Sequence, residues 1–250
     1  MCLVLPRVAR VGQRRDLQVG AGGQQLGAQW AVEALRWAVA TDGRYDPAVG
    51  GAIELWDVNN RHAPPSEERV RALAGRQLHR AVEVGAQGGH PVVLFHDADV
   101  RLDLGAIAKG YAVDCAVEEL REWGITDAIV CAGGDLHAMG HGLDDEPWRV
   151  GIQDPREPER IADTLALSDR AVATSGDYHQ YFSWRGMRYH HLMDPETAAP
   201  RRTPVHSDTI MADHCMTADV ASTAVFGLAP ADANRLIRLR ANDAQHVRNL

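Results

Sequence analysis

Residues 107–135, IAKGYAVDCAVEELREWGITDAIVCAGGD, contain the two patterns that decide the fold. Apolar side chains recur at helical spacing from Ile107 to Trp123, and Gly124 is typical of the left-handed residue that closes a helix. The next apolar run, 128–132, is short and contains β-branched residues, so it predicts a buried strand that breaks at the glycines after it. A helix and a strand therefore follow one another within one short stretch.

The rest of the chain shows the same mixture. Helical spacing predicts helices at 30–39, at 66–82 with Ser66 as the N-cap, and at 217–228 and 230–240. Residues 45–51 are expected to form a loop that leads into a short apolar turn ending at Trp56. A hairpin is expected from strands 91–95 and 100–104, and further strands are expected at 148–152, 164–167, 171–174, 178–184, 189–193 and 205–211.

These elements predict an α+β fold. Residues 27–250 are expected to form a single domain of mixed strands with several packed helices, because no repeat or low-complexity linker divides them. Residues 1–26 are rich in arginine and glycine and lack either period, so they are expected to be a poorly ordered lead-in.

The composition excludes several classes of function. The 34 acidic and 26 basic residues leave a net charge of −8, which disfavours nucleic acid as a partner. The four cysteines form no CxxC pair, which argues against a zinc ribbon and against a dense disulfide framework. Since the chain has no signal-peptide core, no lipobox and no apolar run of membrane-spanning length, we expect a cytoplasmic protein without a transmembrane segment. Export stays open if the N-terminus is incomplete.

The chain has 25 arginines but only one lysine, Lys109. This lysine follows Gly105, where an expected strand turns into the helix, so its ammonium and the free N–H groups of the helix start are suited to a phosphate. The alternative is a tight turn with a solvated lysine.

Two further motifs place polar groups at the ends of expected strands. Gly133 and Gly134 precede Asp135, and this pattern allows a ligand to approach the backbone closely or makes an ordinary turn. Ser175 and Asp177 carry oxygen atoms that suit a ribose or base edge, although Ser-Gly-Asp is also common in loops.

A third motif lies on the helix expected from residue 217. Asp219, Ser222 and Thr223 are spaced i, i+3 and i+4, so they share one face and present only oxygen atoms. Such ligands suit Mg²⁺ when substrate phosphates complete its coordination shell. The alternative is an aspartate that offsets the helix dipole, with hydroxyls bonded back to carbonyls.

The pair His190-His191 precedes Met193. On a strand the two imidazoles face opposite sides, so a single metal ion is not expected to bind both. One of them is a candidate acid–base group, and a hydrogen-bonded structural histidine is the alternative.

In their order and form these motifs resemble the ApbE-type FAD:protein FMN transferases, over roughly residues 27–230. The chain departs from the family pattern where Ala198 follows Thr197 in place of glycine, and we expect it to lack most of the N-terminal strand segment with which the family begins. The segments that carry the resemblance are 45–50, 103–114, 133–135, 173–178, 191–195 and 218–224.

The resemblance implies an Mg²⁺-dependent transfer of FMN from FAD to a threonine of an acceptor flavoprotein, with release of AMP. It implies that His191 activates the acceptor hydroxyl. The metal would be held by the carbonyl of Ala106 and the side chains of Asp219, Ser222 and Thr223. Residues expected around FAD are Tyr45, Asp46, Asp103, Lys109, Gly133, Gly134, Asp135, Ser175, Asp177 and Met193. The alternatives are an FAD-binding protein without transferase activity and an Mg²⁺-dependent FAD pyrophosphatase.

Overall fold

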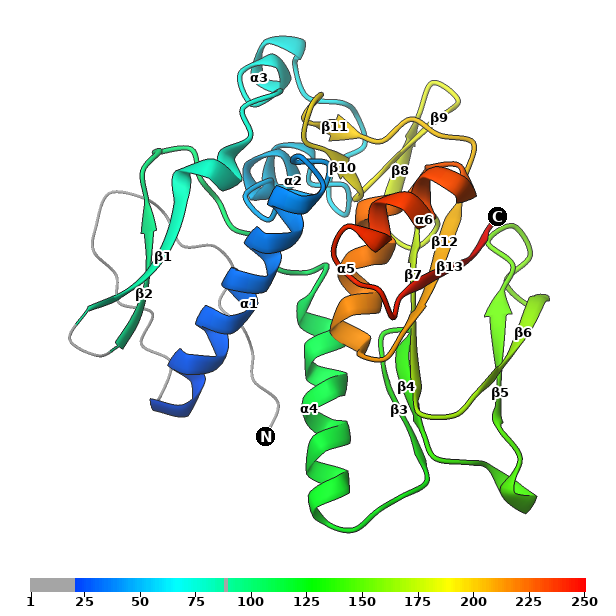
Figure 1. Ribbon diagram of the computed structural model, residues 1–250. Coiled ribbons are helices and arrows are strands. Elements are labelled where there is room, and N and C mark those ends of the chain that lie inside the picture. The colour runs from blue at the N-terminus through cyan, green and yellow to red at the C-terminus, as the bar shows by residue number, and fades with distance from the viewer. Residues whose placement is uncertain (1–20, 88–89) are drawn as a thin grey trace. The chain divides into compact units, whose positions relative to one another are not determined.

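A computed structural model describes residues 21–87 and 90–250 (Figure 1). The chain forms two compact units. Unit 1 comprises the described residues up to Leu104 together with 180–200, and unit 2 comprises 105–179 together with 201–250. Helices and strands occur in both units, which confirms the predicted α+β class.

Unit 2 is built on a five-stranded antiparallel sheet with the order β13-β12-β7-β4-β3. Helices α4 and α5 pack against one another and against this sheet, and strands β5 and β6 form a separate hairpin. The elements of unit 2 are α4 (Ala108–Glu122), β3 (Ala128–Ala132), β4 (Asp135–Met139), η2 (Leu143–Asp145), β5 (Trp148–Gln153), β6 (Ile161–Leu167), β7 (Arg170–Gly176), β12 (Ser207–Ala212), α5 (Cys215–Val225), α6 (Pro230–Arg238) and β13 (Gln245–Asn249).

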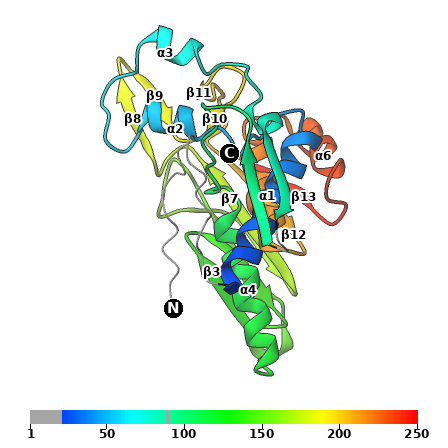
Figure 2. The same ribbon diagram turned by 90° about the vertical axis from the view of Figure 1, so that its left-hand side faces the viewer.

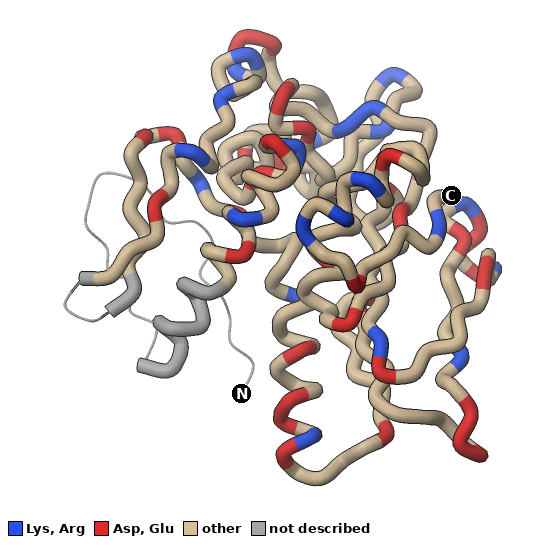
Figure 3. Tube along the Cα trace, viewed as in Figure 1, with Lys and Arg blue, Asp and Glu red and all other residues tan. Residues whose placement is uncertain are grey.

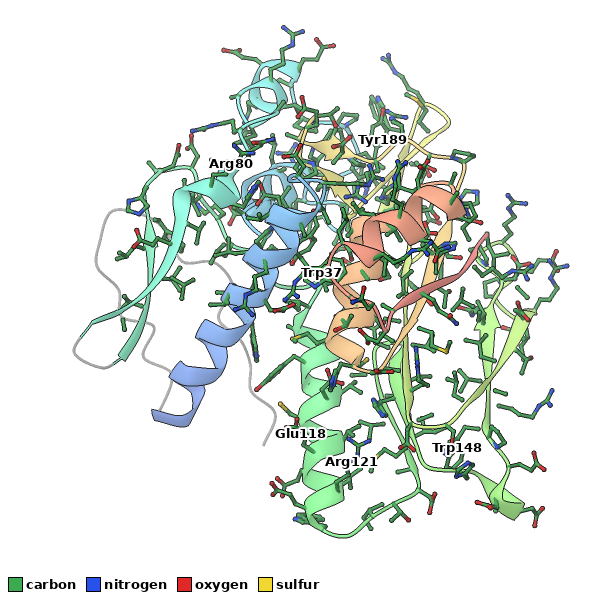
Figure 4. All side chains as sticks on the ribbon, in the orientation of Figure 1. Trp37, Arg80, Glu118, Arg121, Trp148 and Tyr189 are labelled. Carbon is green, nitrogen blue, oxygen red and sulfur yellow. The ribbon has the colours of Figure 1, made fainter. Side chains whose placement is uncertain are left out.

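Both faces of the unit 2 sheet are covered. Met139 of β4 packs with Val113 and Val117 of α4, whereas Ala138, its neighbour in sequence, packs with Leu167 of β6. Successive strand residues face opposite sides, so β4 contributes to two core clusters. Trp148 of β5, labelled in Figure 4, donates from Nε1 to the carbonyl of Met139 at 2.8 Å.

Unit 1 combines helices with two-stranded ladders. Hairpin β1–β2 lies beside α1 in both views (Figures 1 and 2). A second core cluster contains Trp56, Phe182 and Tyr189, whose rings stack. The elements of unit 1 are α1 (Ala21–Ala40), α2 (Gly50–Trp56), α3 (Glu67–Arg71), η1 (Leu78–Ala81), β1 (Val82–Gln87), β2 (His90–Phe95), β8 (Tyr181–Trp184), β9 (Met187–His190), β10 (Met193–Asp194) and β11 (Ala199–Pro200).

Two predictions in this unit were wrong. The helix expected over 66–82 stops at Arg71, because the chain adopts positive φ angles at Gly75 and Gln77 and then enters β1. The expected hairpin between 91–95 and 100–104 does not form: β2 pairs with β1, while Arg101 makes only a parallel bridge to Val49. Val82 and Val84 alternate as in a strand, but Val82 also fits the apolar face of the expected helix. The sequence pattern around Val82 was therefore ambiguous.

Other expectations agree with the structure. The helix at α4, its closure by Gly124 at φ +79° and the strand at β3 are confirmed. The expected turn ending at Trp56 is helix α2, and strands β4 and β13 were not predicted. Residues 21–26 belong to α1, and the rest of the expected lead-in lies outside the described residues. In the part of the chain that the structure describes, no helix has the length and apolarity needed to cross a membrane.

Candidate active site

The single lysine of the chain lies between two buried carboxylates in unit 2. Lys109 is in the first turn of α4, and its Nζ lies 2.9 Å from Oδ1 of Asp219 and 3.1 Å from Oδ2 of Asp135. The same Nζ donates to the carbonyl of Gly105 at 3.1 Å. Helix α5 supplies Asp219 and the start of β4 supplies Asp135. We call Lys109, Asp135 and Asp219 the charged cluster.

The charged cluster exists because α4 and α5 approach each other closely at Gly110. A Cβ at this position would lie 2.4 Å from the carbonyl oxygen of Cys215, so a larger residue would force the helices apart. The backbone N–H of Gly110 donates to Oδ2 of Asp219 at 3.0 Å. Both oxygens of the Asp219 carboxylate are therefore engaged by the start of α4.

Asp114, one turn further along α4, fixes the other helix. Its carboxylate accepts from the N–H groups of Cys215 at 2.7 Å and Met216 at 2.9 Å, and so it caps the N-terminus of α5. Burial raises the pKa of Asp114, although these two N–H groups oppose the shift. Gly110 and Asp114 are functional neighbours that sequence reasoning missed. A glycine inside a helical pattern was the available signal.

The charged cluster carries one positive and two negative groups. The side chains of Asp135 and Asp219 are only 3% and 4% exposed. Burial and the neighbouring Asp219 raise the pKa of Asp135 to about 7, and burial also raises the pKa of Asp219. For Lys109, burial acts to lower the pKa, but the two carboxylates outweigh it and the pKa is raised. With both acids ionised, the cluster has one negative charge in excess, which favours a cation.

Three hydroxyl groups form a chain close to Asp219. Ser175 of β7 has its Oγ 2.7 Å from Oγ of Ser222 and 3.0 Å from Oγ1 of Thr223. The hydroxyl of Ser222 donates to the backbone carbonyl of Asp219 at 2.8 Å. This is the hydroxyl-to-carbonyl bond that the sequence offered as the alternative to metal binding. The structure thus brings Ser175 together with the two α5 hydroxyls, a contact that helical spacing alone does not reveal.

The donor set fits Mg²⁺ by its chemistry. In the described ranges, no three His, Cys, Asp or Glu side chains are grouped to hold a metal ion. The unit instead offers two carboxylates that share one lysine, and neighbouring hydroxyls. Mg²⁺ is commonly bound by one or two carboxylates when phosphates and water complete its shell. Ala106 lies in the turn directly before α4, so the metal role of its carbonyl stays a prediction.

The diglycine turn lies beside the lysine. Gly133 and Gly134 have φ angles of +61° and +98°, which L side chains rarely adopt. A Cβ at Gly133 would lie 3.4 Å from Cδ of Lys109, whereas one at Gly134 would meet nothing within 4 Å. The turn therefore leaves the backbone open next to the charged cluster.

Asp177 follows β7 and bonds with a residue that the sequence did not single out. Its Oδ2 lies 2.9 Å from Nδ1 of His206, and its N–H donates to the carbonyl of the same residue at 3.0 Å. This pair joins the ends of β7 and β12. A role of Asp177 toward a cofactor stays a prediction.

In unit 1, Asp46 belongs to a buried pair. Its Oδ1 accepts from the N–H of Ala48 at 2.7 Å, and its Oδ2 lies 2.9 Å from Nδ1 of His79. Tyr45 is also buried, and Asp103 donates from its backbone N–H to the carbonyl of Pro47. A small hollow in this unit is lined by Asp46, Ala48, Val49, Gly51, Ala52, Leu73, Arg76, Gln77, Leu78, Pro195 and Ala198.

The two adjacent histidines of unit 1 have different environments. His190 ends β9, is 4% exposed, and accepts at Nδ1 from the N–H of Leu192 at 3.2 Å. His191 is half-buried and donates its backbone N–H to the carbonyl of Gln180. Met193 is buried in the cluster around Trp56. Since β9 ends at His190 and His191 lies in the bend after it, the expectation that the two imidazoles face opposite sides of a strand stays a prediction.

These features define an α+β protein in which a partly exposed lysine at the start of a helix contacts two buried carboxylates. The profile of the ApbE family matches residues 24–247, and the chain belongs to this family. It is 34% identical over 217 residues to the FAD:protein FMN transferase of Vibrio cholerae, covering 82% of this chain and 63% of the relative. It is 34% identical over 219 residues to the enzyme of the same name from Treponema pallidum, covering 82% and 60%.

The solved structures give the same result. The crystal structure of the ApbE protein from Thermotoga maritima aligns with a TM-score of 0.76 at 35% identity, over 89% of this chain and 71% of that one. The flavin transferase ApbE from Vibrio cholerae aligns with a TM-score of 0.70 at 27% identity, over 90% and 74%. The chain spans about three fifths of the length of the two curated relatives that it matches above.

Proposed function

We propose that this chain transfers FMN from FAD to a hydroxyl group of an acceptor protein. Its relatives are named FAD:protein FMN transferases, and it shares their family profile. The observation that carries the proposal is the charged cluster, in which Lys109, Asp135 and Asp219 meet at the start of α4. Phosphoryl transfer depends mainly on charge neutralisation and positioning, and these groups are suited to both.

In more detail, we propose that the reaction needs Mg²⁺, modifies a threonine and releases AMP. Asp219 would hold the metal with Ser222, Thr223 and the Ala106 carbonyl. When bound, Mg²⁺ would neutralise pyrophosphate charge and polarise the phosphoryl oxygens. Lys109 would bind pyrophosphate oxygens with its ammonium, and the N–H groups at the start of α4 would orient them.

We assign proton removal to His191. The threonine oxygen forms a bond to the phosphorus of the FMN phosphate, and the bond from this phosphorus to the bridging oxygen breaks. AMP leaves with that oxygen, and the hydroxyl proton passes to His191. An imidazole is suited to this step because its ordinary pKa lies near neutrality. His190 is a poorer candidate because its Nδ1 already accepts a backbone hydrogen bond.

Incubation with FAD, Mg²⁺ and a candidate acceptor flavoprotein tests the proposal. The expected result is a fluorescent acceptor band with the mass increase of FMN, together with AMP in equal amount. Omission of Mg²⁺, or a threonine-to-alanine acceptor, should abolish the band. Free FMN and AMP without labelling would show a pyrophosphatase, and bound but unchanged FAD would show a binding protein. Either outcome would reject the transferase.

A further inference from the structure

Strands β8 and β9 of unit 1 form a hairpin in which Phe182, Tyr189 and His190 are buried and the other side chains are exposed. Phe182 and Tyr189 are paired across the ladder and buried, and the ring of Tyr189 stacks on that of Trp56 with 5.3 Å between centroids. The stack anchors the hairpin to the core of unit 1. Figure 4 labels Tyr189 on its strand.

Three other large side chains of the hairpin are exposed. Tyr181, Trp184 and Met187 are 41%, 37% and 44% exposed. Arginines lie over both aromatic rings, with Cζ of Arg188 4.5 Å from the centroid of Tyr181 and Cζ of Arg185 5.5 Å from that of Trp184. We call Tyr181, Trp184, Arg185, Met187 and Arg188 the hairpin surface.

The composition of the hairpin surface is that of a protein-binding site. Tyrosine, tryptophan, methionine and arginine are the residue types enriched at interfaces, and exposed single apolar residues elsewhere need no such explanation. Here all five side chains stand within eight residues of sequence. Tyr181 and Arg188 lie on the face opposite the stacked rings, whereas Trp184 and Met187 lie on the same face as the rings, next to the turn that contains Arg185. A rigid surface of this kind loses little entropy when a partner binds.

Charge indicates the kind of partner. Between Tyr178 and Met193 the chain has two arginines and no aspartate or glutamate, although its net charge is −8. Figure 3 shows basic positions and no acidic ones on this hairpin. A local basic surface attracts a segment that carries carboxylates. The net negative charge of the chain repels such a segment from the rest of its surface.

The hairpin also leads directly to the proposed catalytic base. His191 follows the last residue of β9, and its N–H donates to the carbonyl of Gln180, which precedes β8, at 3.1 Å. We propose that the hairpin surface docks an acidic segment of the acceptor protein, next to the hydroxyl that receives FMN. This inference rests on the proposed function and adds to it the acceptor chemistry that the chain recognises.

Two labelled synthetic peptides test this inference. Both carry a central threonine, flanked in one by aspartates and in the other by lysines. Binding is measured by fluorescence anisotropy, and transfer is measured by mass in the presence of FAD and Mg²⁺. We expect the acidic peptide to bind roughly tenfold more tightly, by charge complementarity, and the preference to shrink in high salt.

The double variant Arg185→Glu/Arg188→Glu should remove or invert the preference. Arg149→Glu is the matched control, because Arg149 is also an exposed strand arginine on a two-stranded ladder, in unit 2. It should behave as the parent does. The thermal midpoint of each variant checks folding, and if the double variant unfolds, Arg185→Gln, which should weaken the preference, replaces it.

Equal binding of the two peptides by the parent, or an unchanged preference in the folded double variant, would overturn the inference. Arginine-dependent binding to anionic lipid vesicles without a peptide preference would also overturn it, since the surface would then serve a membrane. Hairpin-dependent binding of the acidic peptide, with no transfer to any peptide or protein, would reject the proposed function and leave the docking surface standing. The two failures are therefore distinguishable.

Discussion

Unit 1 and unit 2 each bury aspartate side chains, but they satisfy the charge differently. Asp46 has one histidine and backbone N–H groups from Ala48 and His79, so its oxygens are bonded within its own surroundings. Asp135 and Asp219 share the single ammonium of Lys109. The bonds of Asp46 join the loop at Ala48 to His79. The arrangement in unit 2 raises the pKa of Asp135 to about 7, so above that pH the cluster carries one negative charge in excess, which costs stability and favours the binding of a cation.

The strongest test of this contrast is Asp219→Ala. We expect transfer to fall by at least roughly 10²-fold, the scale on which loss of one preorganised charged group acts. Turnover should be measured across Mg²⁺ concentrations, with Asp232→Ala on the exposed side of α6 as the control. Unchanged activity at limiting Mg²⁺ would reject the metal role, and reduced stability with intact metal dependence would indicate a helix-dipole role.

His191→Ala should spare FAD binding and slow transfer by roughly 10²–10⁴-fold, the usual contribution of a positioned base. Transfer by the parent should fall at low pH as the imidazole becomes protonated, and this acidic limb should vanish in the variant. His190→Ala should lower stability and slow transfer much less, because His190 is buried against Leu192. Transfer at the parent rate by the His191 variant would remove this histidine from the mechanism.

Lys109→Arg tests whether the charged cluster needs a compact ammonium. The guanidinium is longer and planar, so we expect a loss of roughly tenfold in kcat/KM for FAD, equivalent to about 1.4 kcal/mol. Steady-state kinetics and FAD titration measure the effect. Equal affinity and turnover would make the single lysine an accident of composition.

Asp135→Asn tests how the charged cluster makes the free energy of unfolding depend on pH. The pKa of Asp135 is raised from 3.8 to about 7 by burial and by Asp219, so between these values the folded state holds a proton that the unfolded state has lost. The stability contributed by this group is therefore present at low pH and is lost as pH rises toward about 7. Urea unfolding at acidic and mildly basic pH should show a smaller decline for the asparagine variant. Parallel declines would contradict the raised pKa.

The smallest effect concerns Ala198, which has φ +50° and is 2% exposed. Its replacement by glycine relieves about 1 kcal/mol of left-handed strain but loses a buried methyl group, so the free energy of unfolding should change by less than about 1 kcal/mol. Ala221→Gly in the buried interior of α5 has no strain to relieve and should cost roughly 2 kcal/mol. Equal losses at the two positions would show that the backbone of Ala198 is unstrained.

Secondary structure was predicted best where the local sequence pattern of one element fits only one type of structure. Helix α4, its closure at Gly124 and strand β3 were all predicted from local pattern. The segment around β1 was not, because Val82 fits both a helical face and an alternating strand, and only its pairing with Phe95 distinguishes them. For the candidate site, the residue types were visible, but Gly110, Asp114 and His206 were missed because their importance lies in contacts across long sequence separations.

The sequence by itself determined the residue types of the site and the local elements that carry them, including a single lysine at the start of a helix and an aspartate on a later one. Only the tertiary structure decided that Lys109, Asp135 and Asp219 meet, since periodicity shows which side of an element is buried and not what covers it. The charges of the cluster were likewise decided there. A carboxyl acquires a pKa near 7 only when packing removes water from it and brings a second carboxylate close.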